Sequence, residues 1–270
     1  MDLLRAIVLG IVQGLTEFIP VSSSGHLVLV PWLLGWPKPP LVFDTTLHWG
    51  TLVAVVGYFR HDLLAILRAT IRDLSKGKPL ASQDSRLGWL IALATIPAVI
   101  MGLLFESQFE ALFGEPTRVA AFLLVTGLLL WTSETLGKRL RDVEALQWGD
   151  GLLIGLAQAL AITPGISRSG ATISMGLLRG LTRPAAARFS FLIMVPIVFG
   201  AGLMQLIELF QTEVTTTTLV PMIVGFFAAA LSGYAAIAFL LDFLARRSVR
   251  IFAVYCWLFG LFCLALAAVR

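Results

Sequence analysis

Apolar runs alternate with short polar stretches along the whole chain, and most of these runs are near the length of a helix that crosses a lipid bilayer. A spanning helix needs roughly 20 apolar residues, because it rises by about 1.5 Å per residue. The pattern predicts six such helices, at residues 43–59, 87–105, 119–136, 189–209, 219–241 and 251–269. The predicted fold class is therefore an all-α polytopic membrane protein.

Two further apolar segments, at 3–34 and 152–178, are interrupted by polar residues. The first contains QGLTEFIPVSSSGH (13–26) and the second contains QALAITPGISRSGAT (158–172), so each places a proline and a glycine among hydroxyl residues. Burying so many polar groups in a membrane is costly unless they have partners or a function. Breaks of this kind are typical of discontinuous membrane helices, and we expect each segment to form a re-entrant hairpin that enters and leaves on one face.

The two interrupted segments are related in sequence. Several glycines, glutamines and serines recur at a constant offset, while Pro20 and Pro164 slip by one residue: Gly10, Gln13, Ser22, Ser24 and Gly25 correspond to Gly155, Gln158, Ser167, Ser169 and Gly170. The chain is predicted to be one membrane domain made of two diverged copies, 1–145 and 146–270. Each copy has one hairpin and three spans, an odd number, so the copies are inverted and a site is expected where they meet.

Composition and charge support this topology. The mean hydropathy is +0.89, with 58% hydrophobic and 13% charged residues, which exceeds the apolar content of soluble domains. Basic residues gather in 60–86, 138–141, 179–188 and 246–250, which predicts that these loops are cytoplasmic. The net charge of +4 is explained by this bias, so no nucleic-acid partner is implied. Both termini, the acidic loop with Glu106, Glu110 and Glu115, and the loop 211–218 are predicted outside.

The first hairpin carries candidate chemistry on one helix face. Gln13 and Glu17 are four residues apart, so their side chains share a face. Their oxygens could hold a hard divalent cation whose other ligands are water or phosphate. The alternative is that Glu17 only hydrogen-bonds the adjacent turn.

A hydroxyl cluster and an imidazole follow in the same hairpin, in the stretch from Ser22 to His26. A hydroxyl near an imidazole can act as an activated nucleophile, and an imidazole can transfer protons or attack phosphorus. Alternatively, the serines cap the next helix and His26 binds a backbone carbonyl.

In the second hairpin, Arg168 is the one basic residue that belongs to no predicted loop or terminus. Ser167 and Ser169 flank it, and Thr172 follows one turn later. A guanidinium beside the N-terminus of a helix suits a phosphate or diphosphate. The alternative is a structural ion pair with Glu17.

Three tryptophans and two polar residues lie near these motifs. Trp32, Trp36 and Trp49 are expected to form an aromatic belt at the outer boundary. Asp44 either supports the residues of the site from behind or caps a helix. His48 either lines the pocket or is a structural histidine.

Taken together, QGLTEFIPVSSSGH and PGISRSGAT resemble the motifs of the bacterial undecaprenyl-diphosphatases of the bacitracin-resistance type. The resemblance covers essentially the whole chain. It implies a multi-pass enzyme of the bacterial cell membrane that removes the terminal phosphate of undecaprenyl diphosphate, so that the lipid carrier returns to peptidoglycan synthesis and bacitracin resistance follows. It also implies a divalent cation, Mg²⁺ or Ca²⁺.

The resemblance implies roles for individual residues. The implied catalytic residues are Glu17, Ser23, His26 and Arg168; the phosphate-binding residues are Ser22, Ser24, Ser167, Arg168, Ser169 and Thr172; the metal ligands are Gln13 and Glu17. Gln13 stands where many relatives have glutamate. The nucleophile remains open between Ser23, His26 and water.

The predicted topology opens the site to the outer, periplasmic side. A homodimer is one option that the sequence leaves open. A lipid flippase or anion transporter is the alternative function, because inverted repeats with broken helices are also the plan of transporters.

Overall fold

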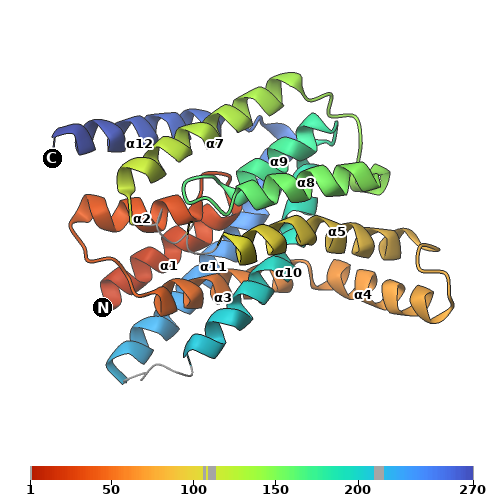
Figure 1. Cartoon of the computed structure of the whole chain (residues 1–270), viewed down its shortest axis with the longest axis horizontal. Coiled ribbons are helices and arrows are strands. Elements are labelled where there is room, and N and C mark those ends of the chain that lie inside the picture. The colour runs from red at the N-terminus through yellow and green to blue at the C-terminus, as the bar shows by residue number, and fades with distance from the viewer. Residues whose placement is uncertain (1, 106–107, 109–113, 210–215, 270) are drawn as a thin grey trace.

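The computed structural model describes residues 2–105, 108, 114–209 and 216–269 (Figure 1). These ranges contain eleven α-helices with defined bounds, one short 3₁₀ helix and no β-strand. The helices are α1 (Leu3–Phe18), α2 (Ser23–Leu34), α3 (Leu41–Tyr58), α4 (Arg60–Ser75), α5 (Gln83–Leu104), α7 (Pro116–Leu136), α8 (Trp148–Leu160), α9 (Arg168–Leu178), α10 (Arg183–Leu209), α11 (Thr216–Arg246) and α12 (Arg250–Val269), with the 3₁₀ helix η1 at Val143–Ala145. The all-α prediction is confirmed.

Five helices of the described chain, α5, α7, α10, α11 and α12, are long and apolar enough to cross a membrane. They match five of the six predicted spans. The sixth, predicted at 43–59, is α3, which passes the same test only together with α4, and the two helices are bent by 77° at Phe59. The protein is therefore a polytopic membrane protein, with five candidate spans among the described residues, or six if the bent pair counts as one.

Both interrupted segments form pairs of short helices, as expected. The chain breaks at 19–22 between α1 and α2, and at 161–167 between α8 and α9. Inside the second break, the Thr126 hydroxyl donates to the Gly165 carbonyl (3.0 Å) and accepts from the Ser167 N–H (2.9 Å). Backbone groups exposed by a broken helix need such partners in an apolar environment.

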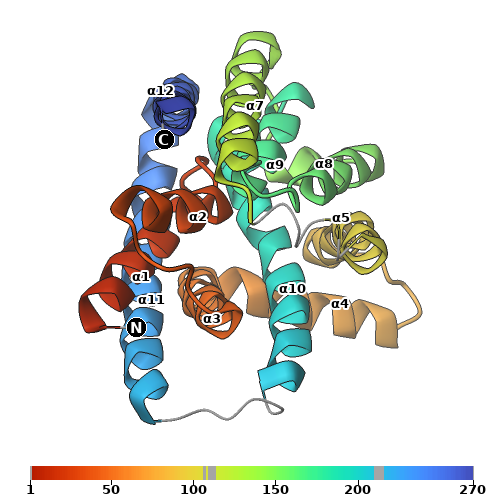
Figure 2. The same cartoon turned by 60° about the vertical axis from the view of Figure 1, so that its left-hand side comes forward.

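The helix packing repeats between the two parts of the chain. Helix α1 packs along α11, and α8 packs along α5 (Figure 2). Gly10 of α1 and Gly155 of α8, which correspond in sequence, allow both approaches: an added Cβ would lie 2.6 Å from the Gly225 carbonyl oxygen and 2.6 Å from the Ala94 carbonyl oxygen, respectively. This match is what two copies of one unit would produce; the division at 145/146 stays a prediction.

The described ends of the chain lie on the same side of the molecule, at the left of Figure 1, whereas the α4–α5 and α7–α8 connections lie at the right. This agrees with the predicted arrangement of termini and basic loops. Glu106, Glu110 and most of the loop 211–218 fall outside the described residues, so their predicted placement stays a prediction.

The basic side of the molecule is held together by buried carboxylates that each bind two arginines. Asp150 contacts Arg141 (2.7 Å) and Arg179 (2.6 Å). Glu134 contacts Arg139 (2.7 Å) and Arg183. Two of these ion pairs, Arg141–Asp150 and Glu134–Arg183, connect the part of the chain before residue 146 to the part after it.

Candidate active site

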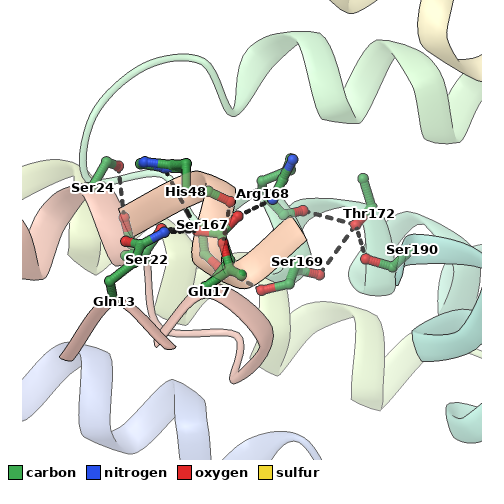
Figure 3. A network of polar contacts seen from close by, with 12 residues as sticks. Gln13, Glu17, Ser22, Ser24, His48, Ser167, Arg168, Ser169, Thr172 and Ser190 are labelled. Atoms are coloured by element: carbon green, nitrogen blue, oxygen red, sulfur yellow. Dashed lines mark hydrogen bonds and ion pairs between the residues drawn. The ribbon is translucent and has the colours of Figure 1, made fainter. Parts of the chain in front are cut away.

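Glu17, in the last turn of α1, is the centre of a polar cluster formed by the two hairpins (Figure 3). Its side chain is 4% exposed. One carboxylate oxygen accepts from the guanidinium of Arg168, and the other accepts from the Ser23 hydroxyl and from the Gln13 amide, the last at 3.1 Å. The predicted meeting of Glu17 and Arg168 is therefore confirmed, and Gln13 and Ser23 join it.

Local sequence explains how each side chain reaches this point. Glu17 and Gln13 share a face of α1 because they are one helical turn apart. Ser23 and Arg168 are the first residues of α2 and α9. The preceding serines cap these helices: Ser22 accepts from the Gly25 N–H (3.1 Å) and Ser167 from the Gly170 N–H (2.9 Å). Each hairpin therefore presents the first residue of its second helix to Glu17.

The cluster lines a cavity of about 800 Å³. Its polar wall is formed by Glu17, Ser22, Ser23, Ser24, Asp44, His48, Gln158 and Arg168. Its apolar lining includes Trp49, Ala98, Ile162, Ile197 and Val198. Lys38, in the α2–α3 connection, and Pro116, at the start of α7, also line it. The arrangement can receive a molecule with a charged head and an apolar chain.

The imidazole beside Glu17 is His48, not His26. His48 Nε2 lies 4.0 Å from Glu17 Oε2, and its Nδ1 bonds the Asp44 carbonyl oxygen (2.8 Å). His26 is buried, faces α12, and does not line the cavity. The structure does not bring His26 to the cavity, because its imidazole hydrogen-bonds Tyr255 and stacks on Phe259 of α12.

Ser167, Ser169 and Thr172 have structural partners and do not line the cavity. Ser167 caps α9 and contacts Ser169 (3.2 Å). Thr172 bonds the Arg168 carbonyl oxygen (2.7 Å) and the Ser190 hydroxyl (2.6 Å). Of the second-motif residues to which the resemblance gives a role, only Arg168 lines the cavity. By contrast, the implied phosphate-binding residues Ser22 and Ser24 of the first motif do line it.

Sequence reasoning underestimated several cavity residues. Gln158 is the counterpart of Gln13 in the repeat, which was a usable signal. Its Nε2 donates to the Ala94 carbonyl oxygen (3.3 Å). The three tryptophans expected in a boundary belt, Trp32, Trp36 and Trp49, line the cavity, and hydropathy could not reveal which way their rings point.

The buried polar atoms near Glu17 decide whether a divalent cation could bind there. The amide oxygen of Gln13 has no hydrogen-bond partner among the described residues, but Gln13 does not line the cavity, and the amide would have to rotate to present this oxygen beside Glu17. The part of the chain that the structure describes contains no group of three or more His, Cys, Asp or Glu side chains that could hold a metal ion. A cation of the Mg²⁺ kind beside Glu17 would therefore need phosphate oxygens and water for most of its ligands.

Fold and site define a polytopic membrane protein with a buried carboxylate–arginine–serine centre between two broken helices. The family model described as bacitracin resistance protein BacA matches residues 6–262, and the chain belongs to this family.

Curated relatives are similar along almost their whole length. An undecaprenyl-diphosphatase of Rubrobacter xylanophilus is 48% identical, over 94% of this chain and 94% of the relative. Undecaprenyl-diphosphatases of Chloroherpeton thalassium and Desulforudis audaxviator are each 44% identical; the first match covers 98% of this chain and 97% of the relative, and the second covers 100% of both.

Proposed function

We propose that this protein hydrolyses undecaprenyl diphosphate to undecaprenyl phosphate and inorganic phosphate. Family membership and the names of the relatives support this function. The structural observation that carries it is the contact of Glu17 with both Ser23 and Arg168 in a cavity that also has an apolar wall. The reaction returns the lipid carrier to peptidoglycan synthesis and confers bacitracin resistance.

The charges of the cavity favour a diphosphate as the head group. Arg168 is 20% exposed at its side chain and donates to Glu17 in the free protein. A phosphate oxygen is a comparable acceptor for a guanidinium, so an incoming diphosphate can take over part of this contact. Ser22 and Ser24 add hydroxyl donors on the same wall. The prenyl chain extends along the apolar wall towards the bilayer.

Ser23 is the nucleophile that the geometry supports best. Its hydroxyl already donates to Glu17, so the carboxylate can accept the proton as Ser23 Oγ forms a bond to the terminal phosphorus. The bond from that phosphorus to the bridging oxygen breaks, and undecaprenyl phosphate leaves. Water then hydrolyses the phosphoserine and releases inorganic phosphate. In the alternative, Glu17 activates a water that attacks directly.

A divalent cation, Mg²⁺ or Ca²⁺, belongs to the proposal. Gln13 and Glu17 would hold it, and it would offset the negative charge of the diphosphate. Because only one of these two ligands is a carboxylate, and Arg168 already contacts it, affinity for the cation without substrate should be weak.

The cavity is proposed to open on the outer face of the bacterial cell membrane. Its rim includes Lys38 and Pro116, which belong to connections that the positive-inside bias places outside. In this orientation the enzyme acts on diphosphate lipid in the outer leaflet, and both termini are outside.

Phosphate release by the purified protein tests this function. With a divalent cation and a prenyl diphosphate in detergent, the wild-type protein should release inorganic phosphate, and chelation should stop the release. Quenching the reaction with labelled substrate should leave label on the wild-type chain and none on Ser23→Ala. No release from folded wild-type protein that still moves lipid across vesicles would instead favour a flippase.

A further inference from the structure

We propose that Tyr255, on α12, is a positioning residue for the reaction: it fixes His26, and through His26 the turn that presents Ser23 to Glu17. This inference rests on the proposed phosphatase function. It concerns the contact between the C-terminal helix and the first hairpin, outside the cavity.

His26 is fixed at both ring nitrogens. Nδ1 lies 2.8 Å from the Ser22 carbonyl oxygen, and Nε2 lies 2.7 Å from the Tyr255 hydroxyl. A carbonyl oxygen can only accept, so Nδ1 carries the proton. In the neutral imidazole Nε2 is then the acceptor, and Tyr255 donates to it. The Phe259 ring stacks on the imidazole with centroids 5.0 Å apart, which restricts its rotation.

The turn that His26 holds has an unusual backbone conformation. Ser22 has φ 73° and ψ 98°, in a region that residues with a side chain rarely adopt. Its carbonyl oxygen accepts from His26 twice, through the backbone N–H (3.1 Å) and through Nδ1. Ser23 follows directly, so any relaxation of this residue would turn the Ser23 hydroxyl away from Glu17.

Helix α12 contacts the same turn at a second point. The Cys256 thiol, one residue after Tyr255, lies 4.0 Å from the Pro20 carbonyl oxygen. Pro20 and Ser22 both belong to the break between α1 and α2: the Ser22 carbonyl accepts the first helical bond of α2, from the His26 N–H, and the Pro20 carbonyl lies two residues before it. The C-terminal helix therefore supplies donors to a turn that belongs to the other half of the chain.

The geometry separates this role from catalysis. Neither His26 nor Tyr255 lines the cavity, whereas Ser22 and Ser23 do. Both nitrogens of His26 are occupied by the contacts described above, so the imidazole has no free nitrogen to offer to a phosphate. Its effect on the reaction must pass through the Ser22 backbone.

Tyr255→Phe removes the hydroxyl while keeping the ring that stacks on Phe259. We expect kcat to fall about tenfold, the scale of one net hydrogen bond, with KM within about twofold and little change in thermal unfolding. Tyr234→Phe is the matched control, because Tyr234 lies on α11 and its ring contacts Tyr58 rather than His26. It should behave as wild type.

A pair of variants at His26 tests the positioning role independently of Tyr255. A glutamine amide can donate to a carbonyl and accept from a phenol, so His26→Gln should retain at least fivefold more kcat than His26→Ala, in protein of equal thermal stability. A residue that attacked phosphorus or carried the proton would lose activity equally in both.

Wild-type kcat in folded Tyr255→Phe overturns the inference, and so does equal loss in the two His26 variants. If Tyr255→Phe does not fold, the His26 pair decides alone. Absence of phosphate release from the wild-type protein would instead remove the proposed function itself.

Discussion

Glu17 is the residue on which the whole site depends, because it contacts side chains from both hairpins. Its carboxylate is buried, and the guanidinium of Arg168 offsets the cost of that burial. The same contact holds the two hairpin tips together in the free protein. The structure shows the ion pair, and under the proposed function Glu17 would become the proton acceptor and Arg168 the phosphate ligand once substrate binds.

Replacing Glu17 with glutamine tests both roles. The amide cannot accept the Ser23 proton, so kcat should fall by about 10²-fold or more. Arg168 loses its counter-charge, but it is partly exposed, so the unfolding free energy should fall by less than the about 3–5 kcal/mol seen for fully buried pairs. Phosphate release and thermal unfolding in detergent measure the two effects.

Asp62→Asn is the matched control for this variant. Asp62 pairs with Arg188 at 2.8 Å, but both side chains are more than one-third exposed. An exposed pair contributes about 0–1 kcal/mol, so activity and stability should stay close to wild type. Full activity in Glu17→Gln would remove Glu17 from the mechanism.

The sequence predicted where helices begin and break more accurately than which side of each helix faces the site. The prolines and glycines in 13–26 and 158–172 located both breaks, because a broken helix in an apolar segment needs these residues. The meeting of Glu17 and Arg168 followed from inverted topology. The place of His26 did not, since the rotation of α2 depends on its packing against α1 and α7, and this turns His26 towards Tyr255 of α12. The sequence could not decide whether His48 lines the pocket for the same reason, because its side of α3 joins the site only when α1 packs beside it.

The contact of α8 with α5 should be sensitive to a single methyl group. Gly155→Ala would place a Cβ 2.6 Å from the Ala94 backbone oxygen, so α8 must shift. We expect the unfolding free energy to fall by about 1–3 kcal/mol, as for other overpacked contacts, and activity to fall because the second hairpin carries Arg168.

Gly149→Ala, in the first turn of the same helix, provides the comparison. An added Cβ at Gly149 meets no atom within 4 Å, so this variant should be at least as stable as wild type. Equal thermal unfolding of the two variants, measured in the same detergent, would show that the close approach of α8 to α5 does not constrain the fold.

At the scale of the whole molecule, the two hairpin tips meet at Glu17 and Arg168, as the predicted opposite insertion of two copies would require. The repeated packing of α1 on α11 and of α8 on α5 supports this account. The arrangement also gives the cavity a direction across the membrane. Lys38 of the α2–α3 connection lines the cavity, whereas the arginine-bound carboxylates Asp150 and Glu134 lie on the basic side of the molecule. Composition predicted that the basic loops share the cytoplasmic side, and an experiment in cells checks that the cavity opens on the other side.

Two matched cysteine substitutions make that assignment. Lys38→Cys lies at the cavity rim and Lys78→Cys in the α4–α5 connection, and both positions are exposed. A membrane-impermeant maleimide added to intact spheroplasts should label Lys38→Cys and leave Lys78→Cys unlabelled until the membrane is permeabilised. The natural Cys256 and Cys263 are buried and should not react. Prenyl diphosphate added beforehand should slow labelling at Lys38→Cys, because its head group enters past this residue. The opposite labelling pattern would place the cavity mouth in the cytoplasm and contradict the proposed access from the outer leaflet.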